Sequence, residues 1–338
     1  MNILFTCAGR RNYLINYFKE ALNGRGLVFA TDMQLSAPAM EDADRAIIVP
    51  SIYDKEYIRT IVKIIRDNDI RALISLNDLE LPILAAHRAE IEDTGATLMV
   101  SSSDIINLSF DKWLTAKFLE GIKIKTPKTF ISLESAIQAL NEGLLTFPLV
   151  VKPRWGSGSI GIEMPEDLEE LRLAYSILQI KLKRTILNEV SKQDPNSAIL
   201  IQEKLDGIEY GIDVINDLEG NYIGTFARQK LAMRAGETDK AISVIDSRIS
   251  DMGRIVAENL RHIGILDCDV FDHNGDLHII EVNPRFGGGY PFSHEAGVNA
   301  PAIYIDWLNG KKNISEHINY KENMMFSKYD KLMNIKMS

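Results

Sequence analysis

Residues 278–289 read HIIEVNPRFGGG, and this stretch decides the fold more than any other part of the chain. Alternation along a β-strand puts Glu281 and Asn283 on one face and Val282 on the opposite face. Carboxylate and amide oxygens on a strand are ligands that Mg²⁺ takes when it also binds nucleotide phosphates. A solvated strand end is the alternative, but an acid, an amide, Pro-Arg and three glycines form too particular a combination for it.

The segment before this stretch supports the same interpretation. Asn274-Gly275 between two alternating apolar runs predicts a tight hairpin, which brings Asp269 alongside the strand of residues 277–282. Asp269, Glu281 and Asn283 are therefore the predicted metal ligands, and Asp267 competes for the place of Asp269. Arg285, just beyond the strand, can stabilise charge on a transferring phosphoryl group.

A second stretch, LVVKPRWGSGS at residues 149–159, delivers a lysine from an apolar strand into a loop of small residues. Glycines let backbone N–H groups approach phosphate oxygens, and Lys152 supplies a point charge. The order of a Walker A loop is absent. Taken alone, the stretch is more typical of an ordinary hairpin with an exposed lysine.

Working outward, residues 1–108 alternate short strands with amphipathic helices, which predicts βαβ units and a parallel sheet. The expected strands are Ile3–Cys7, Leu27–Ala30, Ala46–Val49, Ala72–Leu76 and Thr97–Val100, and the expected helices are Arg11–Leu22, Tyr57–Ile65 and Leu81–Glu92. The pattern changes near Phe110, and from Ala198 onward the chain is rich in strands. The fold class is therefore α/β followed by α+β.

Composition bounds the function. The chain has 338 residues, 46% hydrophobic and 25% charged, with a net charge of −9, which is the balance of a globular protein. No dense Lys/Arg tract is present, so nucleic acid is not an expected partner. Two distant cysteines and the absence of a signal peptide or an apolar run long enough for a membrane span predict a cytoplasmic protein.

These motifs together resemble the ATP-grasp superfamily. The resemblance rests on Lys112, on Lys152 with its Gly/Ser loop, on IQEKLDGIEYGIDV at residues 201–214 and on IIEVNPRFGGG at residues 279–289. It is nearest to the branch around the large subunit of carbamoyl phosphate synthase, with biotin carboxylase and the amino-acid ligases as relatives. It implies four segments: a βαβ pre-ATP-grasp domain (1–108), an ATP-grasp small lobe (109–200), a large lobe with the metal site (201–310) and a C-terminal extension (311–338).

The resemblance also implies roles for individual residues, with ATP and Mg²⁺ (or Mn²⁺) as cofactors. Lys152 and Arg285 would be catalytic, and Asp269, Glu281 and Asn283 would bind the metal. The adenine would be read largely through backbone groups of Glu203–Leu205, and Glu209 would hold the ribose; a surface charge is the alternative for both glutamates. The full predicted ATP site is Lys112, Lys152, Gly156, Ser157, Gly158, Ser159, Glu203, Lys204, Leu205 and Glu209.

Polar loops at the carboxyl ends of the first strands are a predicted substrate site, because open α/β sheets bind ligands at that edge. Basic residues on a later strand would suit an anionic substrate or the phosphates. Half of such loops are caps and turns, and a solvated basic edge is the alternative for the later strand. The predicted substrate residues are Arg10, Arg11, Asn77, Asp78, Glu80, Arg228, Lys230 and Arg234.

The function implied is ATP-dependent ligation, in which a small-molecule carboxylate becomes an acyl phosphate that an amine or another nucleophile attacks. Phosphorylation of bicarbonate or carbamate, as in carbamoyl phosphate synthase, is the runner-up. A nicotinamide-dependent oxidoreductase is disfavoured because the loop at Gly9 lacks the required glycines, although Asp32 is suitably placed. A non-catalytic ATP-binding protein is disfavoured by the intact motif residues. Neither a nucleic acid nor a membrane is an expected partner, and family resemblance suggests a homodimer.

Overall fold

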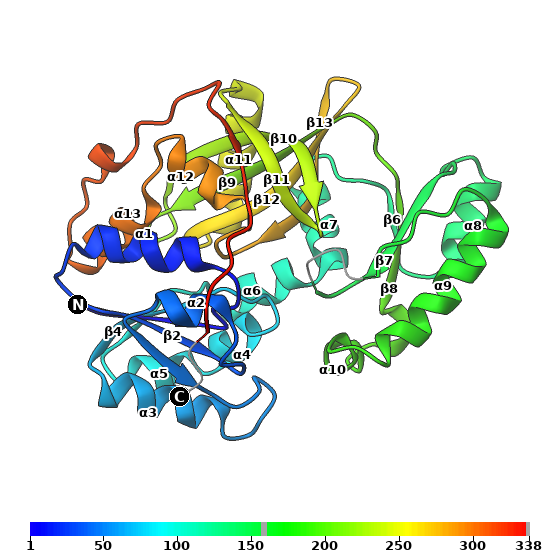
Figure 1. The fold of residues 1–338 in the computed structure, drawn as a ribbon. Coiled ribbons are helices and arrows are strands. Elements are labelled where there is room, and N and C mark those ends of the chain that lie inside the picture. The colour runs from blue at the N-terminus through cyan, green and yellow to red at the C-terminus, as the bar shows by residue number, and fades with distance from the viewer. Residues whose placement is uncertain (157–160, 336–338) are drawn as a thin grey trace.

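The computed structural model describes residues 1–156 and 161–335. Ser157, Gly158 and Ser159 of the predicted phosphate loop lie outside the described residues. The strands form a five-stranded, a three-stranded and a six-stranded sheet, which we call the N-terminal, small and large sheets. Figure 1 shows the small sheet with its helices set apart from the other two, and the N-terminal sheet below the large one.

The N-terminal sheet is parallel, in the order β3-β2-β1-β4-β5, which confirms the predicted βαβ units. Residues alternate between its faces: Ile3 and Phe5 pack with α1, whereas Leu4 packs with α3. Its elements are β1 (Asn2–Thr6), α1 (Asn12–Leu22), β2 (Val28–Asp32), α2 (Pro38–Asp42), β3 (Arg45–Ile48), α3 (Tyr57–Asp67), β4 (Ile70–Ser75), α4 (Leu81–Ala86), α5 (Arg88–Glu92) and β5 (Thr97–Leu98).

Two helices, α6 (Ser103–Phe110) and α7 (Lys112–Gly121), lead to the small sheet, which is antiparallel in the order β6-β8-β7. The carboxylate of Asp111 caps α7 by accepting from the backbone N–H groups of Trp113 and Leu114, which stabilises a helix start. The elements that follow are β6 (Thr129–Phe130), α8 (Leu133–Asn141), β7 (Leu149–Pro153), α9 (Leu168–Leu182), α10 (Leu187–Ser191), η1 (Pro195–Ser197) and β8 (Ile199–Glu203).

The large sheet is antiparallel, in the order β13-β12-β9-β10-β11-β14. The predicted hairpin at Asn274-Gly275 is confirmed, since both residues have positive φ angles of 54° and 88°, as a type I′ turn requires. The elements are β9 (Ile208–Asn216), β10 (Tyr222–Arg234), β11 (Glu237–Val244), α11 (Ser247–Leu260), β12 (Gly264–His273), β13 (Asp276–Asn283), α12 (Tyr290–Glu295), α13 (Ala300–Leu308), η2 (Ser315–His317) and β14 (Met325–Ser327).

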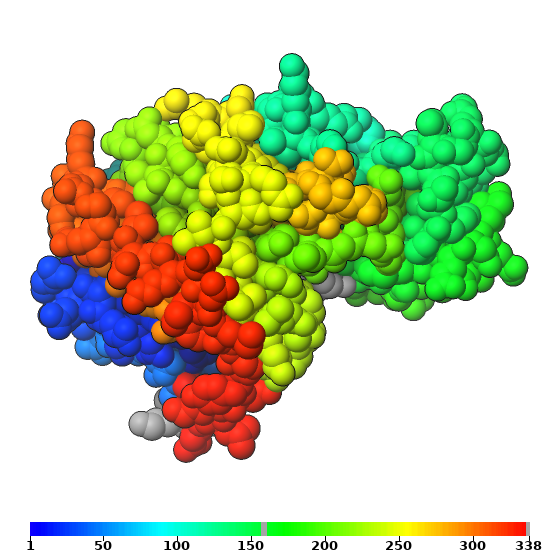
Figure 2. Space-filling model, turned by 90° about the horizontal axis from the view of Figure 1, so that it is seen from above, coloured from blue at the N-terminus to red at the C-terminus, as the bar shows by residue number. Residues whose placement is uncertain are grey.

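Apolar packing joins the N-terminal and large units. Phe18 of α1 lies edge-on against Phe286 and Tyr304, with ring centroids 6.1 Å apart in both pairs. These side chains belong to one core with Phe5 and Tyr290. Seen from above, the small sheet with its helices (green) projects from one side of this body (Figure 2). The position of the N-terminal unit against the large sheet is therefore set by a shared core.

The opposite faces of the large sheet differ in character. Helix α11 covers one face with Ile249, Met252 and Val256, which pack on Ile212 and Val214 of β9. The other face carries charged side chains and lines a cavity of about 880 Å³ that also touches the small sheet. The large sheet thus presents a polar floor to an interlobe cleft. None of the helices in the described part of the chain is long and apolar enough to cross a bilayer.

The segment limits expected from the sequence stay a prediction. The three sheets fall within residues 2–98, 129–203 and 208–327. Strand β14 of the large sheet lies in the segment 311–338, which the sequence left open between a docked strand and a helix.

Candidate active site

The interlobe cleft gathers residues from all three units. It is lined by carboxyl ends of the N-terminal sheet at Cys7 and Asn77, by the small sheet at Lys152 and by the large sheet at Asp269 and Glu281. Most of the predicted ATP, metal and substrate residues lie along it. Those lining it are Arg11, Asn77, Asp78, Lys112, Lys152, Gly156, Glu203, Lys204, Leu205, Glu209, Arg228, Lys230, Asp269, Glu281, Asn283 and Arg285.

The chain crosses from the small to the large sheet at residues 203–208, beside the cleft. The Lys204 side chain pairs with exposed Asp206 at 2.5 Å, so the side chain does not depend on a ligand. Gly207 has a φ of +139°, and a Cβ there would lie 2.0 Å from the carbonyl oxygen of Asp272. The crossing therefore packs its backbone against the β12–β13 hairpin, which suits reading a flat base by main-chain groups.

Two lysines meet where α7 and β7 approach the large sheet. The Lys112 ammonium donates to the carbonyl of Gly156 and lies 3.7 Å from the Glu281 carboxylate. Lys152 is only 6% exposed, and among the described residues no carboxylate lies within 4.0 Å of its ammonium. Burial, opposed by Glu281 and aided by Lys112, lowers the pKa of Lys152 to about 8. A buried cation without a close counter-ion is an incomplete arrangement that an anion would complete.

A neighbouring ion pair holds these lysines in place. Arg154 follows β7 and makes a two-pronged contact with Asp111, with nitrogen–oxygen distances of 2.7–3.0 Å. The backbone N–H of Lys112 also donates to the Arg154 carbonyl at 3.2 Å. The start of α7 is thus fixed to the end of β7. Sequence analysis did not identify Asp111 and Arg154, although each is the neighbour of a motif residue.

The hairpin of β12 and β13 brings Asp269, Glu281 and Asn283 together, and their role as metal ligands stays a prediction. Asp269 pairs in register with Glu281, and Asp267 pairs with Asn283, while Val282 is buried in the core on the other face. Only oxygen ligands are offered, which fits Mg²⁺. Glu281 and Asn283 are the better placed, because the Asp269 carboxylate already accepts from Lys230 at 2.6 Å.

Lys230 on β10 bridges two predicted ligand-binding acids. Its ammonium donates to Glu209 and to Asp269, each at 2.6 Å. Although burial lowers the pKa of Lys230, the two carboxylates outweigh it and raise that pKa. Lys230 therefore neutralises the floor of the cleft between Glu209 and Asp269, and its role toward an anionic substrate or the phosphates stays a prediction.

Arg285 connects the N-terminal unit to the large sheet. Its guanidinium contacts Asp78 at 2.7 Å and Asp267 at 3.2 Å, and all three side chains are largely buried. Asp267 also accepts from Arg228 at 3.1 Å. Burial lowers the pKa of Arg285, but Asp78 and Asp267 outweigh it and raise that pKa. A permanent cation therefore lies in the cleft beside Asn283.

Arg228 is the most enclosed charge of the cleft. It pairs with fully buried Asp213 at 2.6 Å and donates to Ser293 at 3.3 Å. Burial raises the pKa of Asp213 against the opposing effect of Arg228. Sequence analysis quoted Asp213 within the stretch of residues 201–214 but gave it no role, because the residues around it read as an apolar strand.

The glycine run has a steric reason. A Cβ on Gly287 would lie 2.2 Å from the Asp267 carboxylate carbon, one on Gly288 2.9 Å from Arg11, and one on Gly289 2.2 Å from Arg228. The backbone of this run therefore passes directly over the charged side chains of the cleft. Glycine at these positions permits that approach.

Several predicted substrate residues do not reach the cleft. Glu80 is fully buried and accepts from Thr6 at 2.8 Å, from Ser75 at 2.6 Å and from Tyr57, so it is a structural acid beneath the cleft rather than a substrate contact. Burial, opposed by these donors, raises its pKa. The correction follows from chain direction: Glu80 begins a helical turn and points back into the sheet.

Arg10 and Arg234 also lie outside the lining of the cleft. Arg234 is exposed and pairs with Asp239 at 3.0 Å and with Asp330 at 2.5 Å. Asp32 is engaged too, because its carboxylate accepts from the backbone N–H groups of Gly9 and Gln34. The first βα turn is therefore closed by Asp32, which leaves that acid occupied rather than open to a nicotinamide cofactor.

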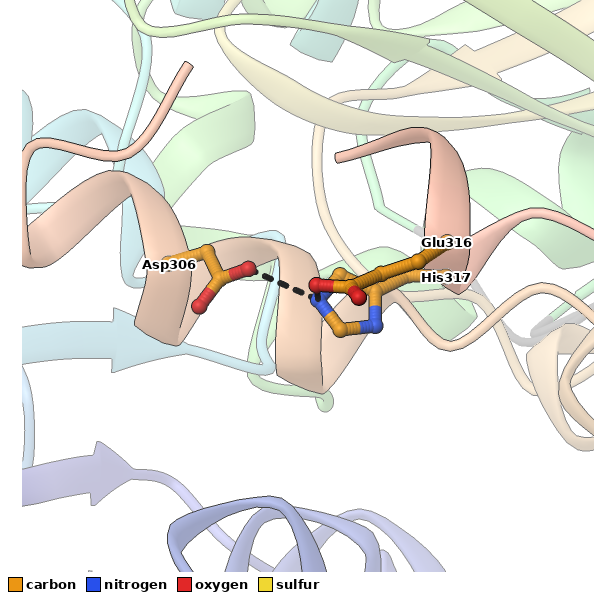
Figure 3. Close-up of side chains that lie close together, drawn as sticks. All are labelled: Asp306, Glu316 and His317. Carbon is orange, nitrogen blue, oxygen red and sulfur yellow. Dashed lines mark hydrogen bonds and ion pairs between the residues drawn. The ribbon is translucent and has the colours of Figure 1, made fainter. Parts of the chain in front are cut away.

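A cluster of possible metal ligands lies outside the cleft. Figure 3 shows Asp306, Glu316 and His317 together, with potential ligand atoms within 4.8 Å of one another. The ammonium of Lys311 pairs with Asp306 at 2.8 Å and with Glu316. A cation of the chain itself thus occupies this cluster, which fastens the turn after α13.

Comparison with known proteins agrees with this geometry. The family model of the ATP-grasp domain matches residues 109–289, more than half of the chain, and a model of the PylC-like N-terminal domain matches residues 3–99. The chain belongs to the ATP-grasp family. The carbamoyl phosphate synthase large chain of Archaeoglobus fulgidus is 26% identical over 235 residues, covering 66% of this chain and 20% of that protein. This ATP-grasp chain thus spans about a fifth of the length of such curated relatives.

Solved structures of ATP-grasp-like architecture cover more of the chain. Biotin carboxylase from Campylobacter jejuni has a TM-score of 0.74 and 16% identity, over 96% of this chain and 74% of that chain. L-amino acid ligase from Bacillus licheniformis has a TM-score of 0.65 and 18% identity, over 93% of this chain and 75% of that chain. At these identities the likeness establishes a shared fold, and it confirms the predicted fold class.

Proposed function

We propose that this protein is an ATP-dependent ligase that phosphorylates a carboxylate and passes the acyl group to an amine or another nucleophile. The observation that carries the proposal is the buried Lys152 ammonium, which faces the Glu281 side of the cleft without an ion-pair partner among the described residues. A triphosphate would supply the missing negative charge. Family membership and the oxygen-only hairpin support the same ligand.

ATP would lie between the small and large sheets. Lys112 and Lys152 would contact its phosphates, and the backbone at residues 203–205 would contact adenine. The Glu281 carboxylate and the Asn283 amide offer hard oxygen atoms, so they would hold Mg²⁺, with Asp269 after release from Lys230. The metal would offset phosphate charge; positioning falls to the chain's own side chains.

The reaction proceeds in two balanced steps. A substrate carboxylate oxygen attacks the γ-phosphorus, the bond to the bridging oxygen breaks, and ADP leaves. The nucleophile then attacks the acyl carbon, the bond to the phosphate oxygen breaks, and inorganic phosphate leaves while an amine nucleophile loses a proton. Arg285 lies beside Asn283 and would bind the charge that builds on the transferred group. No nucleophilic side chain is required.

Hydroxylamine trapping tests the proposal. Wild-type protein with Mg-ATP is screened against amino acids, sugar acids and other small carboxylates, and hydroxamate and phosphate are measured. A carboxylate that yields both supports an acyl phosphate. Lys152→Met should abolish both signals, whereas Lys117→Met on the exposed side of α7 should not. Phosphate release that is independent of every carboxylate, or none at all, contradicts the proposal.

A second candidate is phosphorylation of bicarbonate or carbamate, favoured by the likeness to carbamoyl phosphate synthase large chains. It predicts ATP consumption that rises with bicarbonate in the absence of other carboxylates. The same screen, with bicarbonate and ammonia as one arm, distinguishes the two candidates. The homodimer suggested by the family resemblance remains a prediction, which sedimentation analysis would test.

A further inference from the structure

The C-terminal segment, residues 318–335, adds an edge strand to the large sheet. Strand β14 pairs with β11 through Met325–Ser327 and Lys240–Ile242. Buried Ser243 fixes this register, because its hydroxyl donates to the Lys321 carbonyl at 2.6 Å and accepts from the Met324 N–H at 2.9 Å. The position of the next residue, Lys328, is therefore set by the sheet.

Lys328 turns inward from the end of β14. Its ammonium donates to the carbonyl of Gly288 at 2.9 Å and pairs with Glu237 at 3.2 Å, and its side chain is 25% exposed. Burial lowers the pKa of Lys328 against the opposing effect of Glu237. The ammonium is thus partly desolvated between the Glu237 carboxylate and the Gly288 carbonyl.

Both partners of Lys328, Glu237 and Gly288, line the cleft beside Arg11 of the predicted substrate site, and we call this part of the cleft the substrate end. Glu237 is shared with Arg11 of the N-terminal unit, at the longer distance of 3.5 Å. Burial raises the pKa of Glu237, but Arg11 and Lys328 outweigh it and lower that pKa. Glu237 is therefore an anion whose nearer neutralising cation is Lys328.

Beyond Lys328 the segment continues to the N-terminal unit. Asp330 pairs with Arg234 at 2.5 Å, and the sulfur of Met333 lies 4.0 Å from the side-chain nitrogen of Asn12. Figure 1 shows this stretch (red) descending past β11 toward α2. The segment therefore connects the large sheet to the N-terminal unit beside the cleft.

We propose that Lys328 is a positioning residue of the substrate end: it neutralises Glu237 and holds the Gly288 carbonyl, which weakens the hold of Glu237 on Arg11 and lets Arg11 bind the carboxylate substrate. The inference rests on the proposed ligase function and assigns a role to the C-terminal segment. Without Lys328, the unneutralised Glu237 carboxylate would hold the Arg11 guanidinium. ATP contacts come from other elements and stay as they are.

The test compares Lys328→Met and Lys328→Arg with Lys331→Met, an exposed lysine of the same segment. Phosphate release is measured against carboxylate at saturating Mg-ATP, and against Mg-ATP at saturating carboxylate, using the carboxylate found in the screen. Lys328→Met should raise the KM for the carboxylate about tenfold, the size of one charge-assisted contact, and leave kcat and the KM for ATP within about twofold. Lys328→Arg should restore the carboxylate KM, and Lys331→Met should not change it.

A second variant keeps the test decisive if Lys328→Met lowers Tm. In the Glu237→Gln background there is no charge for Lys328 to neutralise, so adding Lys328→Met should change the carboxylate KM less than twofold. An unchanged carboxylate KM in Lys328→Met, or equal increases for ATP and carboxylate, overturns the inference while the ligase proposal stands. Wild-type protein that uses no carboxylate overturns both.

Discussion

The two ends of the cleft treat charge in opposite ways. At the nucleotide end Lys152 is buried with no carboxylate within 4.0 Å among the described residues, and burial lowers its pKa to about 8. At the substrate end Arg285, Arg228 and Arg11 each contact at least one carboxylate. The first end lacks an anion that a ligand must bring, whereas the second is neutral before any ligand arrives.

This difference has a consequence for binding. An uncompensated buried ammonium destabilises the free protein and stabilises the complex with a polyanion. Paired guanidiniums such as Arg285 are instead held in one geometry, which limits the reorganisation needed when a substrate binds. A substitution of Lys152 should therefore weaken ligand binding without lowering the stability of the free protein. A substitution of Arg285 should lower both.

Lys152→Met should have the largest effect. We expect ATP turnover to fall by about a thousandfold, as for loss of a main phosphate contact. The free energy of unfolding of the ligand-free protein should rise by about 1–3 kcal/mol at pH 7, because a buried charge is removed. Steady-state kinetics and urea unfolding measure the two quantities, and the exposed Lys117→Met is the control. If Lys152→Met loses both activity and stability, the proposed difference between the two ends of the cleft is contradicted.

Arg285→Met should lower activity and stability together. The substitution removes the buried cation that Asp78 and Asp267 share. Breaking a buried ion pair in this way costs about 3–5 kcal/mol of stability. Arg248→Met is the matched control, since Arg248 also contacts two carboxylates but is half exposed, so that water screens these pairs and the loss of stability should be much smaller. Urea unfolding of both variants makes the comparison, and equal losses would show that burial is not the cause.

Gly289→Ala tests the steric reason for the glycine run at the substrate end. Its Cβ would lie 2.2 Å from Arg228, and we expect destabilisation of about 1–3 kcal/mol with a higher carboxylate KM. Gly121→Ala, at the end of α7 with no atom within 4 Å of the added Cβ, should be neutral or slightly stabilising. Thermal unfolding and kinetics decide, and a harmless Gly289→Ala would remove the reason given for the glycine run.

Lys204→Ala should have the smallest effect, although the residue lies in the predicted adenine site. Its side chain pairs with exposed Asp206, and the expected contact with adenine is through the backbone. The KM for ATP should change less than twofold. A large increase would show that the side chain, and not the main chain, reads the base.

The contrast between the two ends also explains what the sequence could predict. Glu281, Asn283 and Asp269 lie on one hairpin, and strand alternation with an Asn-Gly turn places them without tertiary knowledge. Lys152 follows a recognisable strand. The residues predicted for the nucleotide end therefore lie in contiguous stretches with recognisable local patterns.

The substrate end comes from separate segments. Its residues meet only after the N-terminal unit packs on the large sheet and β14 pairs with β11, and no local sequence pattern predicts these contacts. The residues are Arg11, Glu237, Gly288 and Lys328. The prediction that Glu80 contacts the substrate is wrong, because a polar residue that follows a parallel strand can point into the core. Strand β14 lacked the periodicity that would distinguish a docked strand from a helix.

Proton uptake on binding of a non-hydrolysable Mg-ATP analogue at pH 8 tests the central claim most directly. With a pKa of about 8, Lys152 is about half protonated in the free protein, and a bound triphosphate should raise that pKa and complete the protonation. Calorimetry in two buffers of different ionisation enthalpy should therefore show uptake of about half a proton, fading toward pH 6.5. No binding of the analogue, or binding without proton uptake at pH 8, would contradict the account.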